Sequence, residues 1–159
     1  NFKDILDNLL EAVYVTDLDR RIIYWNRGAE KLTGFAKEEV LYRTCSENIL
    51  GHVDRRGVPL CGGQCPLADT MADGKPRETM VVLHHKEGFR RPVRVRTSPL
   101  RNASGAVTGG IEVFEDAMGF LALEEKIQLL ESLTLLDPLT RIGNRRYLEM
   151  QRQIFSEVA

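Results

Sequence analysis

The residues of this chain that could do chemistry gather in one segment, whose potential metal ligands are Cys45, His52, Cys61 and Cys65. The chain has no other cysteines. Three thiolates and an imidazole are a ligand set used by tetrahedral structural zinc sites. Soft sulfur ligands equally suit an iron–sulfur cluster. Residue types therefore allow a metal or cluster site, although Cys-x3-Cys is a less typical ligand spacing than Cys-x2-Cys.

The same cysteines could form a redox switch. Cys65 precedes Pro66 at a predicted helix start, where the helix dipole favours the thiolate form. Cys61 is near enough in sequence to resolve a sulfenic acid on Cys65 into a disulfide. Cysteine is also often buried as a small hydrophobic side chain. The sequence leaves metal binding, redox switching and simple packing open.

Three further side chains are candidates for contact with a cofactor. His84 and His85 are neighbours in a predicted strand, so they point to opposite faces of a sheet. Both faces carry apolar neighbours, and the pattern does not show which imidazole points inward. Trp25 lies in another predicted strand, where an aromatic usually packs in the core. The sequence favours structural roles for all three over contact with flavin or haem.

Hydrophobic periodicity predicts the elements that hold these residues. Helical spacing covers 2–11, and a strand–turn–strand pattern covers 12–25. Short helical segments and then three strands follow, ending at 116. This order predicts an α+β domain with a five-stranded antiparallel sheet and helices on one face. The expected core comprises Leu6, Val13, Val15, Ile23, Leu32, Val93, Val95, Ile111 and Val113.

A further helix is predicted over 117–136. Its apolar residues step by three, four and three, as in a coiled-coil seam, at Phe120, Leu123, Ile127 and Leu130. A helix that packs on its own sheet would show the same short pattern. Because one small domain cannot cover the apolar stripes of both terminal helices, we expect a homodimer formed through them.

Composition excludes some partners. A net charge of −1 gives no general attraction to nucleic acid or anionic lipid. No apolar run is long enough to span a membrane, and the first residues do not have a signal-peptide pattern. We therefore expect a cytoplasmic protein in a reducing compartment. The chain does not begin with Met, so it could be part of a longer protein that is tethered to a membrane upstream.

Two segments carry a family resemblance. "VTDLDRRIIYWNRGAEKLTGFAKEEVLYR" resembles the opening of a PAS sensor domain, and "HHKEGFRRPVRVRTSPLRNASGAVTGGIEVFED" resembles its closing strands. The resemblance covers 12–116 and implies a PAS-like fold with a pocket between helices and sheet. Arg20 departs from the pattern, since the first hairpin more often has Gly there. Ala117-Met118 also replaces the usual Ile-Thr.

A second resemblance lies near the other end. "LTLLDPLTRIGNRRYLE" is similar to the first helix of a GGDEF domain, a family that condenses two GTP molecules into cyclic di-GMP with metal ions. The catalytic motifs of that family follow this helix and are not in these residues, so the fragment itself is expected to be non-catalytic. The implied layout is an N-terminal helix (1–11), a PAS domain (12–116), a connecting helix (117–136) and the start of a GGDEF domain (137–159).

These resemblances imply a sensory module that controls a diguanylate cyclase. A small-molecule or redox signal would change how two output domains pair, and GTP would bind only in the missing output domain. One alternative is a ligand-free PAS dimerisation spacer. Another is a sensor for a degenerate output domain that binds cyclic di-GMP without making it.

Overall fold

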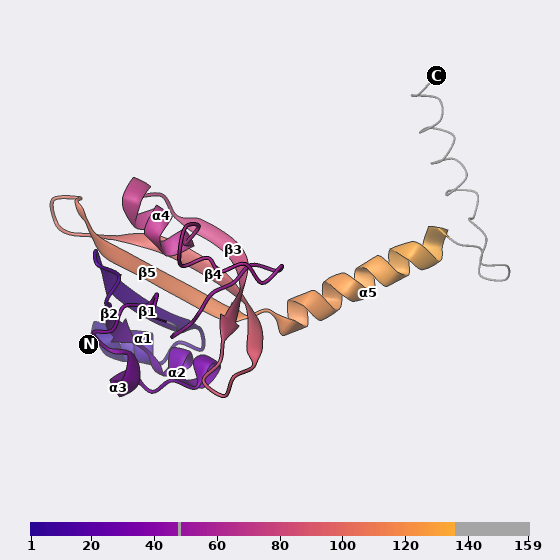
Figure 1. Cartoon of the computed structure of the whole chain (residues 1–159), viewed down its shortest axis with the longest axis horizontal. Coiled ribbons are helices and arrows are strands. Elements are labelled where there is room, and N and C mark those ends of the chain that lie inside the picture. The colour runs from indigo at the N-terminus through magenta and orange to yellow at the C-terminus, as the bar shows by residue number, and fades with distance from the viewer. Residues whose placement is uncertain (48, 136–159) are drawn as a thin grey trace, which may run out of the picture. The chain divides into compact units, whose positions relative to one another are not determined.

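The computed structural model describes residues 1–47 and 49–135. Five strands form one antiparallel sheet in the order β2-β1-β5-β4-β3 (Figure 1). Their bounds are β1 (Ala12–Asp17), β2 (Ile22–Trp25), β3 (Arg77–His84), β4 (Arg90–Arg101) and β5 (Val107–Asp116). The last strand, β5, therefore lies at the centre of the sheet. The predicted five-stranded antiparallel α+β fold is confirmed.

Four short helices accompany the sheet: α1 (Phe2–Asp7), α2 (Arg27–Thr33), α3 (Lys37–Val40) and α4 (Pro66–Asp73). Contacts join α2 to β1, and α4 to β3, β4 and β5. The ends of α2 and α4 follow their sequence signals. Gly34 and Gly74 end these helices in the left-handed region, with φ of 79° and 70°. The first helix is shorter than the predicted 2–11, because α1 ends at Asp7.

The buried face of the sheet differs in part from the prediction. Val13, Val93 and Val95 are buried as expected. Ile23 was predicted wrongly, since 44% of it is exposed while Ile22 is fully buried. The other predicted core residues are only half-buried, namely Leu6, Val15, Leu32, Ile111 and Val113. On β1 and β5 the most deeply buried side chains are instead Tyr14, Thr16, Glu112 and Phe114.

The helix α5 (Met118–Leu135) belongs mainly to a second unit of the chain. Its predicted seam residues are all exposed, namely Phe120, Leu123, Ile127 and Leu130. In the described part of the chain, no helix combines the length and apolarity that crossing a membrane requires. The segment predicted to begin a GGDEF domain, 137–159, lies outside the described residues.

A single buried side chain joins three elements of the domain. The Oδ1 atom of Asn26 accepts hydrogen bonds from the backbone N–H groups of Val13 at 2.9 Å and Ala29 at 2.8 Å. Its Nδ2 donates to the carbonyl oxygens of Leu6 at 2.9 Å and Glu11 at 3.0 Å. Asn26 therefore caps α2 while it holds the N-terminal segment and β1 in place.

We expect Asn26→Ala to destabilise the domain by about 3 kcal/mol or more, because it removes a helix cap and leaves buried backbone groups without partners. The melting temperature followed by circular dichroism should fall by about 10 °C. Asn102→Ala is the matched control, since Asn102 makes its hydrogen bonds within an exposed turn. An equal loss in both variants would contradict the role given to Asn26.

Candidate functional site

The cysteine segment lies along the outer edge of β3. Val53 and Val82 exchange backbone hydrogen bonds of 3.0 and 2.8 Å, and the N–H of His84 donates to the carbonyl of Leu50 at 2.7 Å. Ile49 and Leu50 are buried next to this pairing. These contacts fix the middle of the segment, so the side chain of His52 reaches the interior of the domain.

His52 meets a carboxyl group that the sequence analysis did not single out. The Nε2 atom of His52 lies 3.7 Å from the Oε1 atom of Glu112 on β5, and the two residues are only 5% and 1% exposed. Neither atom has a hydrogen-bond partner. The Glu112 carboxyl also interacts with the Tyr14 side chain through a hydrogen bond. The centre of the site is therefore a buried pair of unpartnered polar atoms.

Burial sets the charge of this pair. It raises the pKa of Glu112 to about 8, although the hydrogen bond from Tyr14 acts in the opposite direction. Burial also lowers the pKa of His52 to about 4. At neutral pH the two groups are therefore mostly a neutral carboxylic acid and a neutral imidazole. Their proximity is not that of an ion pair.

The three cysteines lie near this pair as free thiols. Cys45 and Cys65 are buried, and Cys61 is half-buried. Burial, followed by the nearby Glu112 carboxyl, raises the pKa of Cys45 to about 12. Burial and then the neighbouring Cys65 thiol raise the pKa of Cys61. The structure thus places all four predicted residues in one region, together with Glu112.

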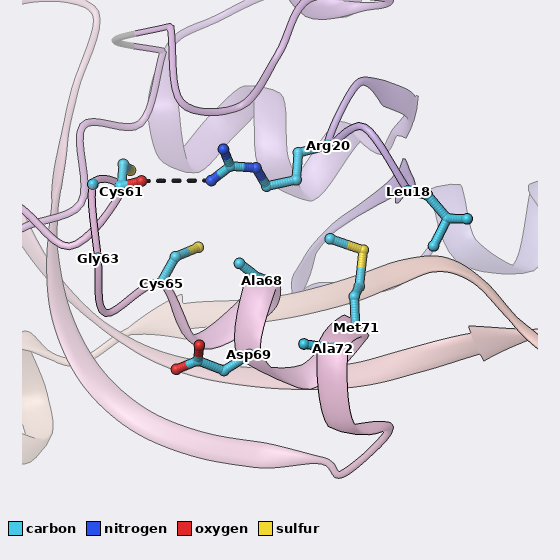
Figure 2. A pocket seen from close by; sticks show the side chains of 10 residues that line it. Leu18, Arg20, Cys61, Gly63, Cys65, Ala68, Asp69, Met71 and Ala72 are labelled. Atoms are coloured by element: carbon cyan, nitrogen blue, oxygen red, sulfur yellow. Dashed lines mark hydrogen bonds between the residues drawn. The ribbon is translucent and has the colours of Figure 1, made fainter.

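A pocket of about 520 Å³ opens beside two of the cysteines (Figure 2). Cys61, Cys65 and Met71 contribute to its wall, and α4 supplies one side. Figure 2 shows Arg20 across the pocket from α4, with its guanidinium directed at the backbone of Cys61. The Nη1 atom of Arg20 lies 3.5 Å from the carbonyl oxygen of Cys61. The thiols at this pocket can therefore be approached from one side.

Arg20 has an unusual backbone conformation. Its φ of 62° lies in the left-handed region, where glycine is favoured and a larger residue is uncommon. This agrees with the sequence observation that the family more often has Gly here. Its N–H donates to the carbonyl of Asp17, and its carbonyl accepts from the N–H of Cys45 at 3.0 Å. The strained turn therefore positions both an arginine and one of the cysteines.

The described side chains do not form an assembled metal site. Across 1–47 and 49–135, no three His, Cys, Asp or Glu side chains converge as the ligands of one ion would. That Cys61 and Cys65 lie within disulfide reach of one another, as a redox switch requires, stays a prediction. The sequence thus identified the cysteines and the histidine that gather here.

The other candidates have structural contacts. His85 is the inward histidine: its ring stacks on Phe89 with centroids 4.2 Å apart, and its Nδ1 accepts from the N–H of Glu87. His84 is half-buried. Trp25 is buried against Tyr14, and its Nε1 donates to the carbonyl oxygen of Phe35 at 3.2 Å. These contacts account for His85 and Trp25 as packing residues.

The sequence analysis missed Glu112 and Tyr14 because both lie in strands whose neighbouring residues are more hydrophobic. In "GGIEVFED", Ile111 and Val113 form the more obvious apolar set. The position of Phe114 could have indicated that Glu112 is buried, since period-two alternation places this large aromatic on the same face as Glu112. A glutamate in phase with a core aromatic would have been worth treating as a buried acid.

Known proteins resemble this chain in sequence and in fold. Residues 10–117 match the sequence profile of the PAS domain family. Over 163 aligned residues the chain is 28% identical to the probable diguanylate cyclase DgcE of Escherichia coli strain K12. That alignment covers 94% of this chain, which spans only 13% of the length of DgcE.

Two solved structures support the same fold. A PAS domain from Colwellia psychrerythraea has a TM-score of 0.60 and 22% identity, with 71% of this chain and 91% of that chain covered. An RNA-binding light-oxygen-voltage receptor has a TM-score of 0.67 and 24% identity, with 82% and 36% covered. The profile match extends over more than half of the chain. The chain belongs to the PAS domain family, and residues 10–117 are its PAS sensory domain.

Proposed function

We propose that this PAS domain senses a signal at the site formed by the three cysteines, His52 and Glu112. The domain then controls a diguanylate cyclase that makes cyclic di-GMP from GTP. The observation that carries the proposal is the direct path from the site to α5. Glu112 lies on β5, and only Ala117 separates the end of β5 from the start of α5. The similarity to DgcE supports the cyclase as the output.

The end of β5 is anchored where it leaves the sheet. Ala117 is 2% exposed, and its N–H donates to the carbonyl of Pro92 on β4 at 3.0 Å. The N–H of Met118 donates to Oδ1 of Asp116 at 2.8 Å. A change in β5 at Glu112 would therefore reach the first residue of α5 through a short, hydrogen-bonded segment.

The proposal includes a homodimer formed through the terminal helices. In α5 the exposed apolar side chains recur at coiled-coil spacing, and in α1 both Phe2 and Ile5 are more than half exposed, at 72% and 62%. Removing such surfaces from water stabilises association by about 25 cal/mol per Å² of apolar area. Pairing of α5 would bring two output domains together, as cyclic di-GMP synthesis from two GTP molecules requires.

Ile127→Asp should weaken this dimer. The substitution removes one apolar side chain from each copy and places two charges in the seam, at a cost of about 3 kcal/mol or more. The dissociation constant measured by analytical ultracentrifugation should rise at least about 100-fold. Gln128→Asp adds the same charge next to the seam and should change it little. A chain that is monomeric at tens of micromolar before any substitution would contradict the dimer.

The cyclase output has a direct test in the longest natural protein that carries this sequence. Incubated with GTP and Mg²⁺, that protein should release cyclic di-GMP, detected by chromatography and mass spectrometry. Ile127→Asp should lower the rate by at least tenfold at concentrations where the variant is monomeric, while Gln128→Asp should not. Binding of cyclic di-GMP without synthesis would indicate a degenerate output domain. A rate that no reductant, chelator or cysteine substitution alters would favour a dimerisation spacer.

A further inference from the structure

We infer that the pocket between the β1–β2 turn, the cysteine segment and α4 binds a free α-amino acid with an apolar side chain. Arg20 holds the carboxylate of this ligand, and Asp69 holds its ammonium group. The inference rests on the proposed sensory function, because it names the class of signal that reaches the same region. The pocket volume of about 520 Å³ lies in the range typical of small-molecule sites.

Two side chains of opposite charge line the pocket from different elements. Figure 2 shows Arg20, from the turn between β1 and β2, facing α4, which carries Asp69. Across 1–47 and 49–135, neither side chain forms an ion pair. A guanidinium binds a carboxylate through two parallel hydrogen bonds, and a carboxylate accepts strong hydrogen bonds from an ammonium group. The two charges therefore suit a zwitterion.

The backbone at Arg20 favours a role for its side chain outside the domain's own packing. A φ of 62° is costly for a residue with a Cβ, and glycine would avoid this cost. Such strain occurs mainly at sites where function requires the particular residue. In the described part of the chain, the guanidinium makes one long hydrogen bond, of 3.5 Å, to the carbonyl of Cys61. That contact does not account for an arginine here, whereas a ligand carboxylate would.

Gly62 and Gly63 keep one wall of the pocket free of side chains. Glycine is needed where φ is positive or where another atom leaves no room for a Cβ. Neither condition holds here. The φ of both residues lies outside the left-handed region, and beyond the adjacent residues no atom lies within 4 Å of a Cβ built on either. The fold does not require this glycine pair, whereas a ligand that approaches the turn closely would.

The rest of the lining selects the body of the ligand. Leu18, Ala68, Met71 and Ala72 give the pocket apolar walls. Leu18 is 59% exposed in its turn, so it is available to cover an apolar side chain of the ligand. Among the described residues of the lining, Arg20 is the one cation. A nucleotide would bring several negative charges next to Asp69, so the pocket fits a small amino acid better.

A ligand in this pocket would act on β5 through Met71. The Cγ atom of Met71 lies 3.1 Å from the position of a Cβ on Gly110, so this side chain packs directly on β5. Its Sδ atom also accepts a hydrogen bond of 3.8 Å from Oγ1 of Thr16 on β1. Gly110 comes two residues before Glu112 on the strand that leads into α5. A shift of Met71 would therefore enter the route to α5 that the proposed function uses.

The test is binding of L-phenylalanine and L-leucine to the 159-residue chain, measured by isothermal titration calorimetry and by thermal unfolding. A bound amino acid at about 100 times its dissociation constant should raise the melting temperature by about 5 to 10 °C. 3-Phenylpropanoate and 4-methylpentanoate lack the ammonium group, and 2-phenylethylamine and 3-methylbutylamine lack the carboxylate. Each analogue should bind at least about tenfold more weakly, because one charged contact is lost.

Three variants test the residues of the pocket. Arg20→Gly suits the φ of 62°, so it should keep or raise the melting temperature without ligand while it weakens binding at least about tenfold. Asp69→Asn should weaken binding of the amino acids but not of 3-phenylpropanoate. Gly63→Leu should fold normally, because its surroundings admit a side chain, and should weaken binding by narrowing the pocket. Arg21→Gln and Asp19→Asn, in the same turn but outside the lining, are the matched controls and should bind normally.

The inference is wrong if neither amino acid binds, or if the carboxylate analogues bind as tightly as the amino acids. Circular dichroism identifies any variant that does not fold. Should Arg20→Gly be such a variant, Gly63→Leu decides, since unchanged affinity there would place the ligand elsewhere. The binding measurements use no GTP, so their failure leaves the dimer and cyclase proposals standing. An amino acid that binds without changing the cyclase rate of the longer protein would contradict the sensory function but not the binding site.

Discussion

The close approach of β5 to its neighbours at Gly109 and Gly110 decides which face of the strand enters the interior. A Cβ on Gly109 would lie 2.0 Å from the carbonyl oxygen of Thr16, and one on Gly110 would lie 2.5 Å from Cδ1 of Leu67 on α4. A side chain at 109 would overlap the backbone of β1, and one at 110 would force Leu67 to move. A one-residue shift of β5 would bring a larger residue there and reverse every side chain. The glycine pair therefore holds Glu112 inside, although Ile111 and Val113 would be the more apolar choice.

This constraint explains what the sequence could and could not predict. Local periodicity identified every strand, and glycine and proline identified the ends of α2 and α4. The phase of β5 could not be read from hydrophobicity, because contact with the backbone of β1 and with the Leu67 side chain of α4 determined it. The prediction for Ile23 was wrong for a related reason: on the short edge strand β2, Ile22, Tyr24 and Trp25 are buried and Ile23 is not. Local pattern specifies an element, whereas tertiary contact selects its face.

The residues of the candidate site divide in the same way, into those that the local sequence could group and those that only the fold brings together. Cys45, His52, Cys61 and Cys65 could be grouped because they share one segment. Glu112 and Tyr14 could not be added, since they come from strands far away in the sequence that only the antiparallel pairing of β1 and β5 brings together. That pairing sets Tyr14 directly opposite Glu112. The buried acid and its hydroxyl partner are therefore consequences of sheet register.

The remaining interior limits the size of any ligand. Tyr14, Trp25 and Phe114 pack against one another with ring centroids 5.6 to 6.4 Å apart, and each is at most 1% exposed. A flavin or haem on this face would have to displace these rings, at a cost of several kcal/mol for each large side chain that leaves the core. A ligand shifts a conformational equilibrium only through different contacts in the two states, so a signal that leaves these rings in place has to act on the groups around them.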